Sequence, residues 1–313
     1  MKICIIGFGN IAKNHIDVFR NLGQEIVASS NRSEKGNLLA KEYGVPKTYS
    51  NYIEMVEIEK PDAIINCVSF QYIFETTKNL IPYRIPLLIE KPAGLSLDEL
   101  QTLIFLQKKY KTIIQVGLNR RHYSVFNKAI KLIGGVDNLN LICMEWSEKP
   151  LRAKLEKGYS DDLVAKLIIA NSIHGIDTLN YFSGGIEKYS IFTKKTDGYF
   201  GWNMILSGQS KTGCLVNFSS SWECPVPWRI NMYGSGKRIE FAPLESCRVF
   251  EEGILNATHI EPDKLDIEFK AGFHKQSLVF YNSIEKQTPT NPHSLESTIN
   301  SMTIAEQMLK SFF

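Results

Sequence analysis

The first twelve residues constrain the fold more tightly than any other part of the chain. The apolar run KICIIG (2–7) is typical of a buried strand, and the pattern that follows from Asn10 is typical of a helix. The turn between them reads G-F-G-N-I-A over residues 7–12. Gly7 permits a tight turn, Gly9 has no Cβ to keep a ligand from the backbone, and small Ala12 lets the helix approach the strand. A unit of this kind begins a parallel α/β sheet.

The same alternation of strands and helices continues to about residue 118. Strand patterns occupy 25–31, 63–69, 86–91 and 112–118, and helical patterns lie between them, the clearest being 10–22, 35–43 and 96–110. Right-handed crossovers between such elements produce a parallel sheet covered by helices on both faces. Residues 1–118 are therefore predicted to form a doubly wound, Rossmann-type domain.

The pattern changes after Asn119. Helical patterns cover 123–133 and 163–182, and a series of short strand patterns separated by glycine turns runs from 187 to 252. Helical patterns at 269–286 and 294–312 close the chain. Consecutive strands joined by short turns form antiparallel sheets. Residues 119–313 are predicted to form a second domain of the α+β class with a mostly antiparallel open sheet.

Composition excludes several classes of protein. The 313 residues include 36 basic and 33 acidic ones, a net charge of +3 that is too balanced to attract nucleic acid or a membrane surface. None of the six cysteines forms a C-x-x-C pair, no Cys/His cluster has zinc spacing, and no metal site is expected. Free cysteines indicate a reducing compartment. With no signal-peptide pattern and no apolar run of membrane length, a cytoplasmic protein is expected.

The glycine turn predicts a dinucleotide site. Free N–H groups at the start of the helix after it can bind a pyrophosphate. The second strand ends at Ser29-Ser30-Asn31-Arg32-Ser33, where an NAD site usually places a carboxylate for the ribose 2′-hydroxyl. Arginine and hydroxyl groups would instead bind a 2′-phosphate, so NADP(H) is favoured over NAD(H). The alternative is that Arg32 is a solvated surface charge. The expected cofactor contacts from these two segments are Gly7, Phe8, Gly9, Asn10, Ile11, Asn31, Arg32 and Ser33.

Four motifs together give the chain a family resemblance. They are the glycine turn followed by His15, Glu90-Lys91-Pro92 after a strand, Asn119-Arg120-Arg121, and H-x-x-D at 174–177. In this order the chain resembles the Gfo/Idh/MocA family of oxidoreductases. The resemblance implies a nicotinamide cofactor, a substrate among sugars, inositols and sugar nucleotides, and a homo-oligomer formed through the C-terminal sheet.

Lys91 is the first expected catalytic residue. It stands at the carboxyl end of a parallel strand, where such sheets bind their ligands. An ammonium beside the nicotinamide could hold a substrate oxygen and assist proton transfer. Glu90 is expected to position the lysine or the nicotinamide ribose. Val68-Ser69 replace the Thr-Pro that is usual in the family, and their backbone could still line the cofactor.

Other positions follow from the resemblance. Asn119 and Arg120 are expected at the substrate, whereas Arg121 and His122 are expected as their surface companions. His15 lies on the apolar side of its helix and is expected to be a packed, hydrogen-bonded structural residue.

His174 is the second expected catalytic residue, because an imidazole titrates near neutrality and can serve as general base. Many family members carry an Asp four residues earlier, on the same helix face, but this chain has Ala170 there. Asn171 could bind substrate by donating hydrogen bonds, although on an α-helix it points about 100° away. Asp177 is expected either at the substrate or paired with a basic side chain. The alternative for His174 is a core or ligand-binding role, with catalysis impaired or absent.

The sequence therefore predicts an NAD(P)-dependent dehydrogenase or reductase of a sugar-like alcohol or ketone. Two alternatives remain open. One is a non-catalytic dinucleotide-binding regulatory protein, suggested by Ser69 and Ala170. The other is a glycosidase that uses NAD transiently.

Overall fold

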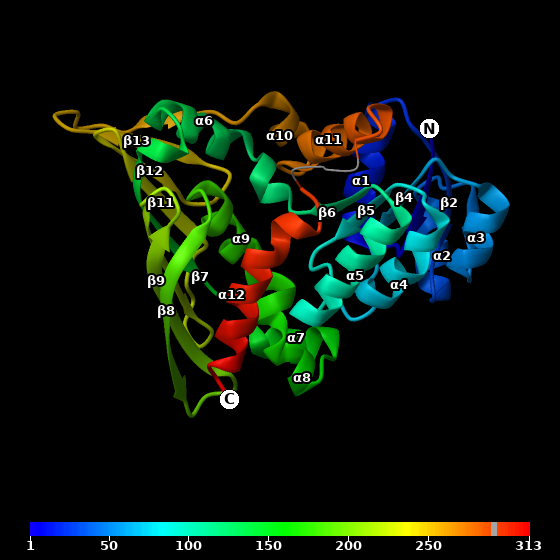
Figure 1. The fold of residues 1–313 in the computed structure, drawn as a ribbon, viewed down its shortest axis with the longest axis horizontal. Coiled ribbons are helices and arrows are strands. Elements are labelled where there is room, and N and C mark those ends of the chain that lie inside the picture. Colours follow the sequence, from blue (N-terminus) through cyan, green and yellow to red (C-terminus); the bar gives the residue numbers. More distant parts are fainter. Residues whose placement is uncertain (289–292) are drawn as a thin grey trace. The chain divides into compact units, whose positions relative to one another are not determined.

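The protein is described by a computed structural model that covers residues 1–288 and 293–313. These residues form two compact units. The first comprises Met1–Asn119 and Glu268–Ile299, and the second comprises Arg120–Ile267 and Asn300–Phe313. Figure 1 labels their helices and strands.

The first unit is built on a six-stranded parallel sheet in the order β3-β2-β1-β4-β5-β6. This order reverses between β1 and β4, and open α/β sheets bind ligands at such a switch point. The elements are β1 (Lys2–Ile6), α1 (Asn10–Asn21), β2 (Glu25–Ser30), α2 (Glu34–Glu42), β3 (Lys47–Tyr49), α3 (Tyr52–Glu59), β4 (Ala63–Asn66), α4 (Ile73–Leu80), β5 (Leu87–Glu90), α5 (Leu97–Tyr110), β6 (Ile114–Gly117) and α11 (Phe273–Glu285).

Helix α11 packs beside α1, although it is far from it in the sequence (Figure 1). Phe280 and Ile284 of α11 belong to the same buried core as Ile16 and Phe19 of α1. The sequence prediction placed all of 119–313 in the second domain, and the structure differs for residues 268–299. The physical reason is the apolar face of α11, which is buried in the core of the first unit.

The second unit is built on an eight-stranded sheet in the order β14-β13-β12-β11-β7-β10-β9-β8. Only β7 and β10 pair in parallel, and the other neighbours are antiparallel. The elements are α6 (Ser124–Ile133), β7 (Leu139–Trp146), α7 (Pro150–Lys157), α8 (Asp161–Ala165), a π-helical turn (Ile168–Ser172), α9 (Ile173–Phe182), β8 (Ile186–Thr196), β9 (Gly201–Ser210), β10 (Leu215–Ser221), β11 (Arg229–Gly234), β12 (Lys237–Phe241), β13 (Cys247–Glu251) and β14 (Thr258–Ile260), with α10 (Lys264–Glu268) and α12 (Ile299–Lys310) at the boundaries of the two units.

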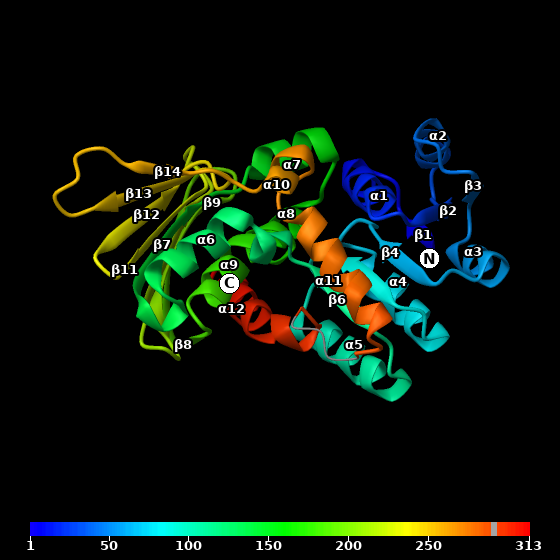
Figure 2. The ribbon, with the colours of Figure 1, turned by 90° about the horizontal axis from the view of Figure 1, so that it is seen from above.

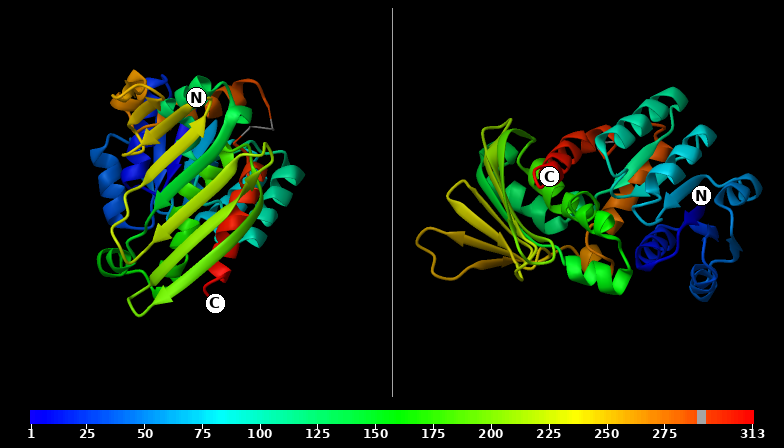
Figure 3. Two further views of the ribbon diagram at one scale, coloured as in Figure 1. Left: turned by 90° about the vertical axis from the view of Figure 1, so that its left-hand side faces the viewer. Right: turned by 90° about the horizontal axis from the view of Figure 1, so that it is seen from below.

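The two faces of this second sheet differ. Helix α9 packs closely on one face, where a Cβ at Gly175 would lie 2.9 Å from Met144 and Trp146. The opposite face is turned to the viewer in Figure 3 (left). Phe192 on β8, Ile205 on β9 and Leu215 on β10 are exposed apolar residues of this sheet. The predicted fold class, a Rossmann domain followed by an α+β domain with a mostly antiparallel open sheet, is confirmed.

The helix predicted over 163–182 is divided in the structure. Helix α8 ends at Ala165, the π-helical turn follows, and α9 begins at Ile173. Short π-helical turns inside helices occur frequently at functional sites. Within residues 1–288 and 293–313, every helix is too short or too polar to span a bilayer.

Candidate functional site

A cavity of about 750 Å³ lies in the first unit, at the carboxyl ends of β1, β2 and β4. Of the expected cofactor contacts, those that line it are Gly7, Phe8, Gly9, Asn31, Arg32, Ser33, Val68 and Ser69. Asn10 and Ile11 begin α1, and Glu90 and Lys91 lie at the end of β5, outside this lining. Tyr52 and Tyr72 also line the cavity and were not predicted. Tyr52 begins α3, a helix that the sequence analysis missed, and Tyr72 directly precedes α4.

The two glycines of the turn have different roles. Gly7 has a φ of +81°, and a Cβ there would lie 2.8 Å from the backbone nitrogen of Val68, so the turn itself requires glycine. Gly9 has an extended backbone, and a Cβ there would meet no atom of the described residues within 4 Å. It is the N-cap of α1 and provides no side-chain cap, so the first N–H groups of the helix are not satisfied by a capping side chain at this position. This geometry fits a pyrophosphate.

The end of β2 lines one side of the cavity. The Arg32 guanidinium is exposed and lies 4.3 Å from the centre of the Tyr72 ring. The Ser33 hydroxyl accepts a hydrogen bond from the Gly36 backbone nitrogen and caps α2. The Asn31 amide donates to Asn37 at 3.0 Å. Among the described residues that line the cavity, none is acidic.

Glu90 is held by His15, as its Oε1 lies 2.9 Å from the histidine Nε2. Burial alone would raise the pKa of Glu90, but the His15 hydrogen bond and the charges of His15, Lys91 and Lys270 outweigh it and lower that pKa. His15 is fully buried and hydrogen-bonded, as its place on the apolar side of the helix predicted. The pair fixes the end of β5, directly before Lys91.

Asn119 lies at the end of the same sheet. Its side-chain nitrogen donates to the Ala271 carbonyl at 3.0 Å, and the residue is buried. The structure therefore gives this amide a partner within the first unit.

In the second unit, Asp177 is enclosed by protein donors. Arg121 Nε and Nη2 donate to its two oxygens at 2.8 and 2.5 Å, and the Ser301 hydroxyl donates at 2.8 Å. Burial alone would lower the pKa of Arg121, but the Asp177 carboxylate raises it overall. The prediction that Arg121 and His122 are surface residues is wrong, because they are 3% and 6% exposed and Arg121 neutralises a buried carboxylate.

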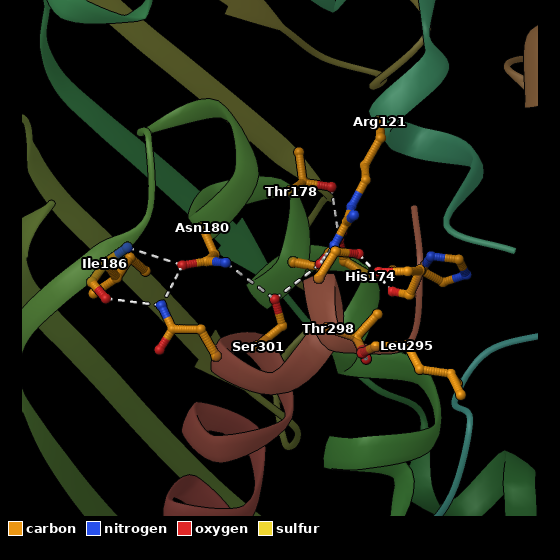
Figure 4. Close-up of polar contacts among 12 residues, drawn as sticks. Arg121, His174, Thr178, Asn180, Ile186, Leu295, Thr298 and Ser301 are labelled. Carbon is orange, nitrogen blue, oxygen red and sulfur yellow. Dashed lines mark hydrogen bonds and ion pairs between the residues drawn. The ribbon is translucent and has the colours of Figure 1, made fainter. Parts of the chain in front are cut away.

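His174 lies in the first turn of α9 and is half-buried. Thr178 donates to its backbone carbonyl at 2.6 Å, and Asn180 connects Ser301 to Ile186 (Figure 4). Helix α12, which carries Ser301, lies beside α9 (Figure 2). These contacts anchor α9 and so fix the backbone that carries His174.

Arg120 lies on a pair of stacked tryptophans. Trp146 and Trp228 stack with ring centres 4.1 Å apart, and the Arg120 guanidinium lies 5.3 and 5.4 Å from their centres. Burial lowers the pKa of Arg120. Its buried Nε has no hydrogen-bond partner among the described residues. An oriented cation with an unused donor is suited to an oxygen-rich ligand.

Glu148 is a buried carboxylate that the sequence prediction missed. It follows β7 and accepts hydrogen bonds from Trp146, Asn171 and Ser172. A signal was present, since Glu148-Lys149-Pro150 repeats the E-K-P sequence two residues after the end of β7. In the described residues, no group of three His, Cys, Asp or Glu side chains is arranged to hold a metal ion.

The fold and the cavity define a protein with a dinucleotide-binding α/β domain, and comparison with known proteins makes this specific. Residues 1–118 match the model of the oxidoreductase family GFO_IDH_MocA, described as an NAD-binding Rossmann fold. The match to this family covers the N-terminal domain and agrees with the resemblance seen in the sequence motifs.

Two curated relatives align with part of the chain. Myo-inositol 2-dehydrogenase of Thermotoga maritima is 28% identical over 130 residues, which is 41% of this chain and 39% of that protein. The rhizopine catabolism protein MocA of Rhizobium meliloti is 24% identical over 153 residues, 48% of each protein. The aligned part thus spans less than half the length of either relative.

Solved structures resemble the whole chain in fold. A dehydrogenase from Chromobacterium violaceum has a TM-score of 0.86 at 17% identity, covering 99% of this chain and 94% of that one. The UDP-N-acetylglucosamine 3-dehydrogenase GnnA from Acidithiobacillus ferrooxidans has a TM-score of 0.80 at 14% identity, covering 99% and 97%. At these identities the likeness establishes the fold of both units.

Proposed function

We propose that the protein is an NAD(P)-dependent dehydrogenase or reductase acting on a CH–OH group of a sugar-like substrate. The observation that carries this proposal is the cavity at the switch point of the first sheet, where Gly9 leaves room for a pyrophosphate at the start of α1. The names of the relatives support the substrate class, since they include an inositol dehydrogenase and a UDP-sugar dehydrogenase.

A bound nicotinamide dinucleotide supplies the hydride acceptor for oxidation or the hydride donor for reduction. The chain's own residues move the proton and stabilise charge. His174 acts as general base and takes the proton of the substrate hydroxyl. The Lys91 ammonium stabilises the negative charge that develops on that oxygen, and the ionised Glu90 beside it keeps the local charge balanced. Arg120 and Asn171 bind other oxygens of the substrate.

The preferred cofactor is NADP(H). The lack of acidic residues among the described residues lining the cavity removes the usual partner of an NAD ribose, and exposed Arg32 offers a positive charge to a 2′-phosphate. The Tyr72 ring also lines the cavity and makes a cation–π contact with the Arg32 guanidinium.

The protein is expected to work in the cytoplasm as a homo-oligomer. The exposed apolar side chains of Phe192, Ile205 and Leu215 on the open face of the second sheet support an interface between copies. Neither nucleic acid nor a membrane is expected as a partner.

A second candidate is a non-catalytic dinucleotide-binding regulator. It is favoured by Ala170, which is only 3% exposed and offers no carboxylate to a substrate, and by Ser69 in the cavity lining. A glycosidase that oxidises its substrate transiently would share the cofactor site and show no net cofactor turnover.

The test is turnover of NADP⁺ or NAD⁺ with a panel of polyols, sugars and sugar nucleotides, followed by nicotinamide absorbance. Wild type should reduce the cofactor, whereas Lys91→Ala and His174→Asn should lose at least about a hundredfold in kcat. His174→Asn should keep its dinucleotide affinity. Tight dinucleotide binding without turnover on the whole panel would favour the regulator, and equal activity of wild type and Lys91→Ala would refute the role of Lys91.

A further inference from the structure

The Glu148 carboxylate lies at the centre of a set of three donors within the second unit. Its Oε1 accepts from Trp146 Nε1 at 3.1 Å and from the Ser172 hydroxyl at 2.7 Å. Its Oε2 accepts from Asn171 Nδ2 at 2.7 Å. Glu148 as a whole is 5% exposed, so these contacts are made away from bulk water. Donors directed at both oxygens are the pattern of an ionised, acceptor-only carboxylate.

This arrangement fixes which way the Asn171 amide is turned. An amide has one donor end and one acceptor end, and only the NH₂ end can face an acceptor-only partner. The Oδ1 end must then point the other way. No residue described by the structure donates to this Oδ1, and it is not among the buried unpartnered atoms, although Asn171 is half-buried. Asn171 therefore presents a hydrogen-bond acceptor on its accessible side.

The π-helical turn at Ile168–Ser172 explains why residue 171, and not 170, has this position. Residue 170 was expected on the same helix face as His174 because α-helical spacing was assumed. The π turn has i→i+5 hydrogen bonds, which alter that spacing. In the structure, Ala170 is buried in the interior. Asn171 is on the accessible side instead, three residues before His174.

We propose that Glu148 is a positioning residue that holds Asn171 with Oδ1 outward, so that Asn171 accepts a hydrogen bond from a substrate hydroxyl. A carboxylate at position 170 would have offered a hydrogen-bond acceptor to the substrate. In this chain the Asn171 amide oxygen supplies that acceptor, and Glu148 sets its orientation. This inference rests on the proposed dehydrogenase function and narrows its substrate. The group facing Asn171 is a donor such as the hydroxyl of a polyol or sugar, and a carboxylate or phosphate is rejected there.

Exchanging the chemistry of the two residues tests the proposal. In Glu148→Gln, the oxygen of the new glutamine amide must still accept from the Trp146 nitrogen, which can only donate. The NH₂ group of the glutamine then faces Asn171. The Asn171 amide must rotate so that its own oxygen accepts from this NH₂ group. The side chain keeps its size and its hydrogen bonds, but Asn171 now presents a donor. The value of kcat/KM should fall about tenfold or more. The double variant Glu148→Gln/Asn171→Asp keeps the total charge and restores an outward oxygen, so it should return to within about threefold of wild type.

The probe is whichever of myo-inositol, glucose, glucitol or UDP-N-acetylglucosamine wild type oxidises fastest. Recovery in the double variant separates positioning from a merely structural role, and thermal unfolding of all three proteins should be similar. A double variant as impaired as Glu148→Gln, or a Glu148→Gln protein with wild-type kcat/KM, would overturn the proposal.

A second measurement does not depend on turnover. The side-chain NH₂ protons of Asn171, assigned by ¹⁵N NMR in the full-length protein, should exchange slowly with solvent in wild type and at least tenfold faster in Glu148→Gln. Equal exchange rates would overturn the inferred orientation. If wild type oxidises none of the probes, the proposed function fails, and the exchange rates still decide whether Glu148 orients Asn171.

Discussion

Arg121 and Asp177 form a buried, bidentate ion pair in which both side chains are at most 2% exposed. Ser301 donates to the same carboxylate, so Asp177 joins α9 to α12 and to the segment that carries Arg121. Of the two roles that the sequence left open for Asp177, this geometry favours the paired, structural one. The Arg121 guanidinium also lies 4.9 Å from the centre of the Tyr181 ring.

Removing one partner of this pair should be strongly destabilising, because the other charge is left buried without compensation. Arg121→Ala and Asp177→Ala should each lower the free energy of unfolding by about 3–5 kcal/mol, measured by urea denaturation. Arg152→Ala, which breaks an exposed ion pair with Glu156, is the matched control and should leave the midpoint unchanged. A stable Asp177→Ala protein with a raised KM would instead support the substrate role.

Local sequence patterns were sufficient to predict the alternation of strands and helices in the first unit. Glycine turns and apolar runs are determined by neighbours in the chain. Helix caps are local as well, and in α5 the Ser96 hydroxyl accepts a hydrogen bond from the Glu99 backbone nitrogen. The glycine turn predicted the cavity for the same reason. The short strand β3 and helix α3 were missed because β3 has three residues, only partly buried, and carries little periodic signal.

Features that depend on distant residues could not be predicted in this way. The grouping of α11 with the first unit depends on Phe280 reaching the core beneath α1. The burial of Arg121 depends on Asp177, 56 residues away, and the role of Glu148 depends on donors from β7 and the π-helical turn. A run such as N-R-R shows the charge of its residues, but it does not show which buried carboxylate forms an ion pair with them.

Arg32 should decide between the two dinucleotides. If it binds a 2′-phosphate, Arg32→Ala should weaken NADP(H) binding about tenfold or more and leave NAD(H) binding within about twofold, because a charged hydrogen bond contributes roughly 1.5–3 kcal/mol. Fluorescence titration with NADPH and NADH measures both affinities. Lys13→Ala removes another cation of the first unit, outside the cavity lining, and serves as the control. An equal loss for both cofactors would refute the NADP(H) preference.

The His15–Glu90 pair predicts a specific loss of stability in acid. The folded-state pKa of Glu90 lies below its ordinary value of 4.5, because the His15 hydrogen bond and nearby positive charges outweigh burial. The ionised carboxylate therefore stabilises the fold fully above about pH 4.5, and this contribution is lost as the pH falls through the lowered pKa. Wild type should exceed Glu90→Gln in unfolding free energy at pH 6, and the difference should shrink towards pH 3.

Urea denaturation at several pH values between 6 and 3 measures this difference. In a His15→Ala background, the same Glu90→Gln substitution should show a much weaker pH dependence, because the main partner of the carboxylate is gone. A difference that stays constant from pH 6 to pH 3 in the wild-type background would contradict the assignment.

The two glycines of the first turn should separate folding from cofactor binding. Gly7→Ala places a Cβ on a residue with a φ of +81° and within 2.8 Å of the Val68 nitrogen, so it should lower the free energy of unfolding by about 1–3 kcal/mol. Gly9→Ala meets no atom of the described residues within 4 Å and has an extended φ of −134°, so its stability should change by less than about 1 kcal/mol. Its Cβ nevertheless enters the space assigned to the pyrophosphate, and dinucleotide affinity should fall at least about tenfold. Urea denaturation of both variants measures stability, and NADPH titration measures dinucleotide affinity. A Gly9→Ala protein that binds NADPH as tightly as wild type would show that the dinucleotide does not bind against this turn.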